Sequence, residues 1–193
     1  SRALRSARTA SISAALQAAG TGSSGAEAPA AVTRAPKSAK VVIAEIDAVT
    51  GAAAAQSARA RAQNSGGDAH FVHCDVREKA NVEAAFAETI RRYGRLDILH
   101  NNAGGSTPDD GPVTDVSEEE FWRALKLDVF GTFLCSKLGI PHLIKAGGGS
   151  IINMSSIVAL RVLPGRDCYT AAKGAVAALT RSMAASPAGA SPR

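Results

Sequence analysis

The sequence lacks any long hydrophobic run. No stretch of its 193 residues approaches the roughly 20 consecutive apolar residues that a membrane-spanning helix needs. We therefore expect a soluble protein without a membrane partner. Because 46% of the residues are apolar and the length suits one domain, the chain can build a single sizeable core.

Cysteine and histidine are scarce. The three cysteines, Cys74, Cys135 and Cys168, are odd in number and widely spaced, which gives neither a disulfide framework nor the spacing of a metal site. The four histidines lie in unrelated segments. We predict no metal centre, and we expect reduced thiols in the cytoplasm or a similar compartment.

Most of the chain carries no net positive charge. Residues 1–40 hold six basic residues and one acidic residue, whereas residues 41–193 hold sixteen of each. A nucleic-acid-binding domain carries its own basic face. Because the net charge of +5 comes from the first forty residues, we expect no nucleic-acid partner.

Residues 1–40 also have few large apolar residues and no regular apolar period. Their Arg-rich, Ser-rich composition is typical of an organelle-targeting peptide over residues 1–25, of a flexible tail, or of a gene read in the wrong frame. These three interpretations stay open, and we expect residues 1–40 to be disordered or misread. Residues 186–193 have no pattern and are expected to form an unstructured tail.

From residue 41 onward, short apolar runs alternate with helical patterns. This alternation predicts an α/β fold whose parallel sheet is covered on both faces. Ser117 and Glu120 have the spacing of a capping box at the start of a long helix. The predicted strands are 41–44, 71–74, 96–99 and 150–154, and the predicted helices are 50–64, 82–90, 118–137 and 168–185.

Tyr169 and Lys173 are four residues apart in the last predicted helix, so they share one of its faces. A free phenol, with a pKa of about 10, is a poor base at neutral pH, but a nearby cation favours its phenolate. Such a pair can exchange a proton with an alcohol or a ketone. Ser156, at the carboxyl end of a predicted strand, can donate a hydrogen bond to the substrate oxygen. Taken alone, the spacing of Tyr169 and Lys173 is more often that of a surface helix pair, and Ser156 can be an ordinary serine that starts a turn at a strand end.

Asn101–Gly104 directly follows the predicted strand 96–99. Its small residues would let a cofactor approach the backbone closely, and its asparagines can tie neighbouring loops together. A simple polar turn explains the segment equally well.

Four sequence signals, in order along residues 41–185, resemble those of the short-chain dehydrogenase/reductase family. They are an acid after strand 41–44, Asp75-Val76, Asn101–Gly104, and Ser156 followed by Tyr169 and Lys173. The resemblance implies a Rossmann-type doubly wound parallel sheet. It also implies an NAD(P)-dependent oxidoreductase that interconverts an alcohol and a carbonyl compound.

The resemblance assigns roles to these residues. Tyr169 would be the catalytic acid/base, Lys173 would favour its phenolate and hold the nicotinamide ribose, and Ser156 would steady the substrate oxygen. Glu45 stands where the family reads the adenosine ribose, and a carboxylate there favours NAD over NADP; Asp47 is the fallback. The other implied cofactor contacts are Asp75 and Val76 at the adenine, and Asn102, Ala103 and Gly104 beside the adenosine ribose.

Asp128 departs from the family pattern. It stands where the family often has an asparagine that holds a proton-relay water near the lysine. A carboxylate can still hold a water, but its charge would weaken the effect of Lys173 on Tyr169. We expect an altered proton relay.

The two ends of the chain depart further from the family. Gly20–Gly25 reads G-x-G-x-x-G, but no buried-strand pattern precedes it and two prolines follow, so we predict no working phosphate loop. We expect the first strand, at the centre of the family's sheet, to be missing or degenerate, which would expose strand edges. We also expect the C-terminal strands to be missing. Our hypothesis is that residues 1–40 and 186–193 are frame errors around a genuine coding core. The alternative function is a catalytically inactive fragment that cannot bind cofactor.

The family resemblance also implies partners. Helices 118–137 and 169–185 are the family's usual subunit interface, so a homodimer or homotetramer is expected. Phe121, Trp122 and Phe133 would belong either to this interface or to the core.

The substrate expected from the resemblance is a small alcohol or ketone. It would lie between the loop Gly105–Gly111 and the segment Ile157–Cys168. Val158, Leu160 and Leu163 make this second border mostly apolar, which hints at a compound other than a sugar.

Overall fold

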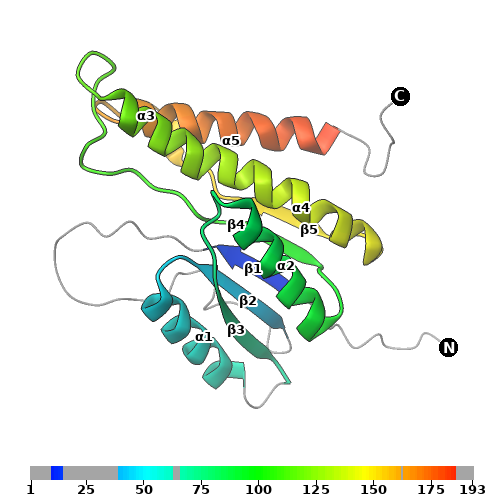
Figure 1. Cartoon of the computed structure of the whole chain (residues 1–193). Coiled ribbons are helices and arrows are strands. Elements are labelled where there is room, and N and C mark those ends of the chain that lie inside the picture. The colour runs from blue at the N-terminus through cyan, green and yellow to red at the C-terminus, as the bar shows by residue number, and fades with distance from the viewer. Residues whose placement is uncertain (1–9, 15–38, 63–65, 162, 186–193) are drawn as a thin grey trace.

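The computed structural model describes residues 10–14, 39–62, 66–161 and 163–185, which form a parallel five-stranded sheet with helices packed against it (Figure 1). The strands are β1 (Ala10–Ala14), β2 (Lys40–Glu45), β3 (Asp68–His73), β4 (Ile98–Asn101) and β5 (Ser150–Asn153). The helices are α1 (Ala48–Ala62), α2 (Lys79–Tyr93), α3 (Glu118–Ala124), the π-helical turn η1 (Leu125–Phe130), α4 (Gly131–Lys145), the short 3₁₀ helix η2 (Ile157–Ala159) and α5 (Asp167–Ala185).

The strand order is β3-β2-β1-β4-β5, and every neighbouring pair is parallel. Each predicted strand and helix is present, with bounds that shift by a few residues. The predicted α/β fold with a parallel sheet is therefore confirmed.

β1 corrects the expectation that the sheet lacks its central strand. It pairs with β2 on one side and β4 on the other, which places Ile12 opposite Val42 and Leu99. The sequence does not predict this strand because Ala10–Ala14 contains no run of large apolar residues. Neighbouring strands pair through hydrogen bonds between main-chain N–H and C=O groups. Almost every residue has these groups, so the pairing does not depend on which side chains the strand carries. A strand with one large apolar residue can therefore fill the centre when both neighbours offer hydrogen-bonding partners.

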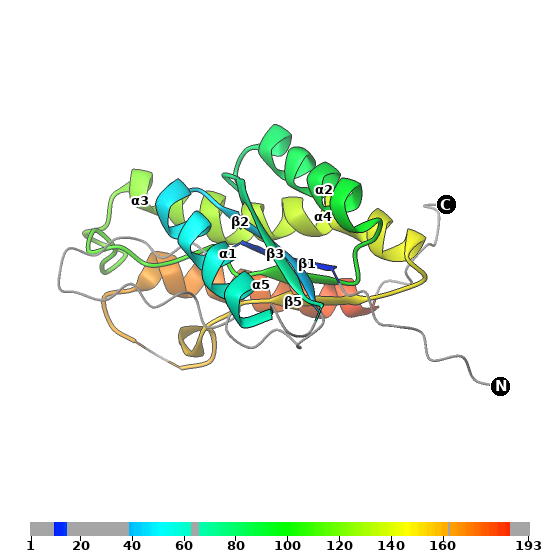
Figure 2. The ribbon, with the colours of Figure 1, turned by 90° about the horizontal axis from the view of Figure 1, so that it is seen from below.

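The two faces of β2 pack against different helices. Val41 and Ile43 belong to a buried cluster that includes Ala54 of α1. Val42 and Ala44, whose side chains alternate with these, belong to a larger cluster formed with α2 and α4. α2 and α4 lie together on one side of the sheet (Figure 2). The sheet is thus covered on both faces, as the apolar runs predict.

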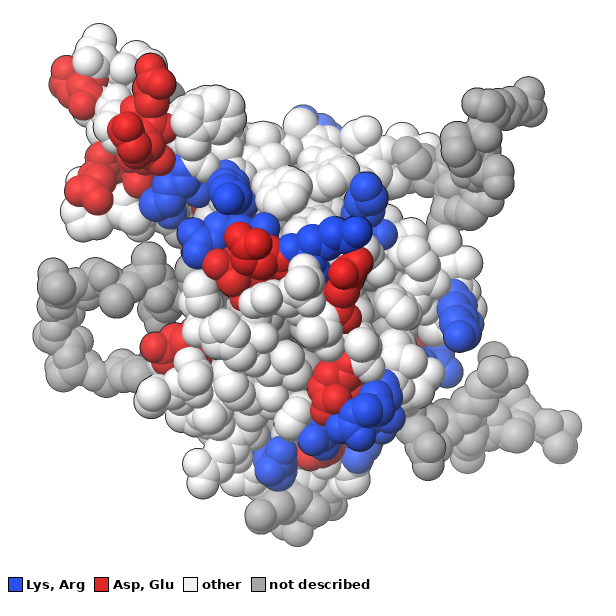
Figure 3. Space-filling view, viewed as in Figure 1, with Lys and Arg blue, Asp and Glu red and all other residues white. Residues whose placement is uncertain are grey.

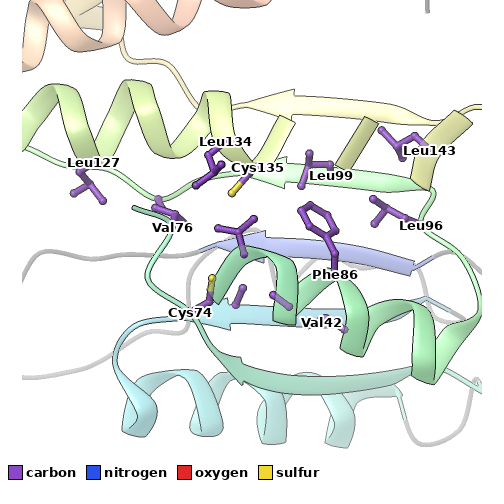
Figure 4. Packing of buried hydrophobic residues seen from close by; sticks show 14 residues of the cluster. Val42, Cys74, Val76, Phe86, Leu96, Leu99, Leu127, Leu134, Cys135 and Leu143 are labelled. Carbon is purple, nitrogen blue, oxygen red and sulfur yellow. The ribbon is translucent and has the colours of Figure 1, made fainter. Parts of the chain in front are cut away.

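The larger cluster depends on a close approach between α4 and its neighbours. Leu99 of β4 and Phe86 of α2 lie at its centre (Figure 4). A Cβ atom on Gly139 would lie 2.8 Å from the Leu99 side chain and 2.9 Å from that of Phe86. The glycine therefore lets α4 pack directly onto β4 and α2.

The helical segment Glu118–Lys145 is longer than the predicted 118–137, because it continues through Pro141 to Lys145. Its start is as predicted, since the Ser117 hydroxyl accepts a hydrogen bond from the Glu120 N–H at 3.2 Å. By length and composition it is the one helix among the described residues that could cross a membrane. Half of its most apolar stretch is buried within the protein, which is also typical of the core helix of a soluble protein.

The aromatic residues of this helical segment are not core residues. Trp122 is 63% exposed, and Phe121 and Phe133 are 37% and 44% exposed. α5 lies alongside α3 and η1 (Figure 1). The alternative that places these aromatics in the core is therefore wrong, and the interface remains a prediction.

Charge on the surface is mixed. Acidic side chains gather at the start of α3, where Glu118 and Glu119 are exposed (Figure 3). Elsewhere on the face shown, blue and red groups lie next to one another without a continuous basic stripe.

Candidate active site

The predicted site residues follow the carboxyl ends of the strands. Because all strands are parallel, the residues after β2, β4 and β5 meet at one edge of the sheet. Glu45 is the last residue of β2, Asn102 and its neighbours follow β4, and Ser156 follows β5. The first half of α5, with Tyr169 and Lys173, is the helix that comes next in the chain.

Lys173 and Asp128 form an ion pair inside this site. Their Nζ and Oδ1 atoms are 2.8 Å apart, and the two side chains are 3% and 0% exposed. The ammonium also donates to the main-chain oxygen of Met154 at 2.9 Å. Two fixed acceptors therefore hold the ammonium.

The π-helical turn η1 carries Asp128. The main-chain oxygen of Asp128 accepts a hydrogen bond from the Thr132 hydroxyl at 2.8 Å, and the Gly105 N–H donates to Asp128 Oδ2 at 3.3 Å. Burial raises the pKa of the Asp128 carboxyl above its ordinary value, and the Lys173 ammonium opposes that shift.

Gly104 allows the backbone after β4 to pass directly over this ion pair. A Cβ atom at this position would press against the Asp128 carboxylate and lie 2.8 Å from Lys173 Nζ. The backbone φ of Gly104 is +155°, a conformation that residues with side chains rarely adopt. The preceding residue, Ala103, is 8% exposed and packs in the core.

Tyr169 lies beside Lys173, as the helical spacing predicts. Lys173 Nζ is 5.6 Å from the centroid of the Tyr169 ring. The Ser155 hydroxyl, in the segment after β5, donates to the main-chain oxygen of Lys173 in the first half of α5 at 3.0 Å. The tyrosine and lysine therefore share one side of the helix at the carboxyl edge of the sheet.

Ser156 caps the short helix η2, which packs against α5. Its hydroxyl oxygen accepts a long hydrogen bond of 3.4 Å from the Val158 N–H. The hydroxyl hydrogen can still be directed elsewhere, since a serine both donates and accepts.

The two candidate carboxylates after β2 have different environments. Glu45 is 7% exposed, and its Oε1 accepts hydrogen bonds from the main-chain N–H groups of Ile46 (2.8 Å) and Asp47 (3.1 Å). Burial raises the pKa of Glu45, and these two hydrogen bonds oppose the shift. Asp47 instead accepts from the Thr50 N–H, in the first turn of α1, at 2.7 Å, and the hydrogen bond from the Thr50 hydroxyl lowers the pKa of Asp47.

Asp75 already has a partner. Arg77 donates two forked hydrogen bonds to its carboxylate, with distances of 2.6 and 2.8 Å, and these bonds lower the pKa of Asp75. Val76 is buried, and a Cβ atom on Gly131 would lie 2.7 Å from its side chain. Contact of Asp75 and Val76 with an adenine stays a prediction.

Asn101 has a larger structural role than the sequence indicates. Its Nδ2 donates to Ser136 Oγ of α4 (3.1 Å) and to Asn153 Oδ1 of β5 (2.8 Å). Asn153 Nδ2 in turn donates to Thr180 Oγ1 of α5 (2.9 Å). This chain of amides joins two strands and two helices beneath the site. The expectation that the asparagines after the strand tie neighbouring segments together thus applies to Asn101.

Sequence reasoning missed Asp110. Its carboxylate is buried, and it accepts hydrogen bonds from the main-chain N–H groups of Cys168 and Tyr169, both at 3.1 Å. No local pattern reveals this contact, because the partners are 58 and 59 residues away along the chain.

Two other expectations concern groups that could bind ligands. The glycine-rich segment Gly20–Gly25 lies outside the described residues. Within the described ranges, no three His, Cys, Asp or Glu side chains are grouped as a metal site requires.

A family model described as short chain dehydrogenase matches residues 19–190. A 2-(R)-hydroxypropyl-CoM dehydrogenase of Xanthobacter autotrophicus is 38% identical over 119 residues, which are 61% of this chain and 48% of that protein. The chain spans about half the length of the curated relatives it matches.

Solved structures are also similar. A short chain dehydrogenase from Mycobacterium smegmatis superposes with a TM-score of 0.77 at 27% identity, over 92% of this chain and 70% of that one. An NAD+-bound xylitol dehydrogenase superposes with a TM-score of 0.65 at 28% identity, over 76% of this chain and 54% of that one. The sheet order, the site geometry and the family match lead to one conclusion: the chain belongs to the short-chain dehydrogenase family.

Proposed function

We propose that the protein is an NAD-dependent oxidoreductase that interconverts an alcohol and a carbonyl compound, with Tyr169 as the acid/base. The observation that carries this proposal is the buried Lys173 ammonium, 5.6 Å from the Tyr169 ring centroid at the carboxyl edge of the sheet. A cation beside a phenol favours the form that accepts a proton. Ligands of open α/β sheets bind at this edge.

The protein residues would manage the proton and the substrate oxygen. In the oxidative direction, the alcohol gives its hydroxyl proton to Tyr169 Oη, and its carbon gives up a hydride. A bound nicotinamide cofactor would supply the acceptor for that hydride, and Lys173 would hold its ribose. The Ser156 hydroxyl donates a hydrogen bond to the substrate oxygen and holds it near the phenol. Reduction of a ketone follows the same steps in reverse.

Glu45 supports NAD rather than NADP. A carboxylate at the end of the second strand accepts hydrogen bonds from ribose hydroxyls and repels a 2′-phosphate. Two main-chain N–H groups fix the Glu45 carboxylate at this edge. Its position and chemistry fit an adenosine ribose. Asp47 is less suitable because it caps α1 through Thr50.

Asp128 modifies the proposed proton relay. Its carboxylate is paired directly with Lys173 at 2.8 Å, so part of the effect of the ammonium on Tyr169 is neutralised. Lys173 would have to reach both Asp128 and a ribose hydroxyl when cofactor binds, and an ammonium has three N–H groups with which to do so.

The segment after β5 supports a substrate that is not a sugar. Ile157, Leu160 and Leu163, in η2 and in the segment after it, are 69%, 87% and 51% exposed, where the family places the substrate. Apolar side chains of this kind favour contact with a hydrocarbon group. We propose a small alcohol or ketone with an apolar body.

We also propose that the protein assembles as a homodimer or homotetramer. The exposed aromatics Phe121, Trp122 and Phe133 lie on the helical segment that neighbours α5. Covering them would remove apolar area from water. We further propose a cytoplasmic location, which the three free and buried cysteines support.

Binding of NADH tests this function. The purified chain is expected to shift and enhance NADH fluorescence, and NAD+ is expected to be reduced when a panel of apolar secondary alcohols is added. The protein should bind NADPH more weakly than NADH. The Glu45→Ala variant should show a smaller difference between its affinities for the two nucleotides. A folded chain that binds neither nucleotide would contradict the proposal and favour the inactive fragment.

A further inference from the structure

Asp110 holds the start of α5 from a distant part of the chain. It lies in the loop between β4 and α3, and its side chain is buried. Oδ1 accepts a hydrogen bond from the Cys168 N–H and Oδ2 accepts one from the Tyr169 N–H, each at 3.1 Å. One carboxylate therefore satisfies two of the N–H groups that the first turn of a helix leaves without partners.

α5 also contributes a carboxylate that contacts the loop. Asp167, the first residue of α5, directs its Oδ2 to the Val113 N–H at 2.8 Å instead of capping its own helix. Each carboxylate thus binds main-chain N–H groups of the other segment. Such hydrogen bonds to an ionised group are roughly twice as strong as neutral ones.

Arg166 strengthens the same junction. Its guanidinium donates to Ser106 Oγ at 3.0 Å and to the main-chain oxygen of Thr107 at 2.5 Å. Ser106 Oγ lies 3.4 Å from Asp110 Oδ2, within a long hydrogen bond. Arg166 therefore joins the start of α5 to Ser106 and Thr107 of the loop that carries Asp110.

The other side of the loop is fixed to α3 and to the ion pair. Glu120 accepts a hydrogen bond from the Thr107 hydroxyl at 2.9 Å and pairs with Arg123 at 2.6 Å. Arg123 also donates to the Gly105 oxygen at 3.1 Å, and the Gly105 N–H donates to Asp128. Through Gly105 the loop contacts Asp128, the partner of Lys173, and through Asp110 it contacts the backbone of Tyr169.

We infer that Asp110 is a positioning residue for Tyr169, fixing the backbone that carries the phenol relative to Lys173. This inference rests on the proposed function. The first turn of a helix frays readily, and Tyr169 is the third residue of α5. Without Asp110 the phenol would lose its fixed position, and a displacement of about 1 Å can cost roughly a hundredfold in rate.

Fluorine NMR can test this inference without relying on activity. The chain has two tyrosines, so labelling with 3-fluorotyrosine gives two resonances. Tyr93 is an internal control, because it belongs to α2 and donates its hydroxyl to Asp68 of β3. The full-length chain would be compared with Asp110→Ala, Asp110→Asn and the control Asp115→Ala, whose side chain is exposed in the same connection.

Asp110→Ala is expected to shift and broaden the Tyr169 resonance and to leave the Tyr93 resonance unchanged. Asp110→Asn should give a smaller change, because a carboxamide oxygen can still accept one of the two N–H groups. Asp115→Ala should alter neither resonance. If Asp110→Ala does not fold, the comparison rests on Asp110→Asn. An unchanged Tyr169 resonance in the folded variant, or equal changes at both tyrosines, would overturn the inference.

Kinetics supply the second readout. In Asp110→Ala the kcat should fall at least about tenfold while the KM for NAD stays within about twofold, because the tyrosine and not the cofactor site is disturbed. A kcat equal to that of Asp115→Ala would contradict a positioning role. If the parent chain shows no turnover at all, the proposed function fails, but the fluorine spectra still decide whether Asp110 positions Tyr169.

Discussion

Lys173 and Asp128 form a buried ion pair, with Nζ and Oδ1 2.8 Å apart and both side chains almost fully removed from solvent. Breaking a buried pair by removing one partner strands a charge in a poorly solvated environment. The geometry of this pair leads to separate predictions about stability and about activity.

The first prediction concerns the stability of the pair. Lys173→Met should lower the free energy of unfolding by about 3–5 kcal/mol, because the Asp128 carboxylate is left without its counter-ion. Adding Asp128→Asn to this variant should restore much of the loss, since the stranded charge is gone. Urea unfolding of the parent, the two single variants and the double variant measures this coupling. Additive losses would show that the two side chains do not interact.

The second prediction concerns the pH dependence of activity. In Asp128→Asn the carboxylate no longer offsets the Lys173 ammonium, so Tyr169 lies beside a larger net positive charge. The kcat profile for alcohol oxidation should therefore differ between the two proteins, with the variant keeping its activity to lower pH than the parent. Identical pH profiles for the two proteins would show that Asp128 has no role in the proton relay.

The third prediction concerns the backbone over the ion pair. Gly104→Ala places a methyl group against Asp128 and 2.8 Å from Lys173 Nζ, so the pair must separate or the loop must move. We expect a loss of about 1–3 kcal/mol in unfolding free energy, the usual cost of overpacking. Gly111→Ala is the matched control, since a Cβ atom there meets nothing within 4 Å. Equal stabilities of the two variants would contradict the described packing.

The fourth prediction follows from the raised pKa of Glu45. The folded protein keeps the Glu45 proton at a pH at which the unfolded chain has lost it, so stability from this group is lost as the pH rises from about 4.5 through the folded value. Glu45→Gln keeps the oxygen that accepts from Ile46 and Asp47 but does not ionise. It should therefore gain stability relative to the parent over this pH range, by about 1.4 kcal/mol for each unit of the shift.

Asp47 provides a control of opposite sign for this measurement. Its pKa is lowered by Thr50, so its contribution to stability is present above its unfolded value of 3.8 and is lost as the pH falls. Asp47→Asn should therefore be less stable than the parent at neutral pH and approach it in acid. Thermal unfolding across pH measures the stability of Glu45→Gln and of Asp47→Asn relative to the parent. If both relative stabilities changed in the same direction with pH, the Glu45 account would be wrong.

Local contacts explain why much of the site could be predicted from the sequence. Tyr169 and Lys173 belong to one helical turn, so their adjacency follows from spacing alone. The apolar run Val41–Ala44 likewise specifies a buried strand by itself. These features need no knowledge of the rest of the chain.

Long-range contacts explain why the remainder could not be predicted. Asp110 reaches main-chain N–H groups 58 and 59 residues away, and any acidic residue in a loop looks the same in sequence. β1 holds the centre of the sheet through main-chain pairing, although Ile12 is the one large apolar residue in its sequence. In both cases the partner that gives the residue its role is distant in the sequence.

Replacement of Tyr169 by phenylalanine tests the central claim most directly. The variant keeps the ring beside Lys173 but lacks the hydroxyl that exchanges a proton, so the turnover of an alcohol that the parent oxidises should fall by about 10²–10⁴-fold, while NADH binding by fluorescence stays as in the parent. Turnover by Tyr169→Phe at the parent rate would contradict the account.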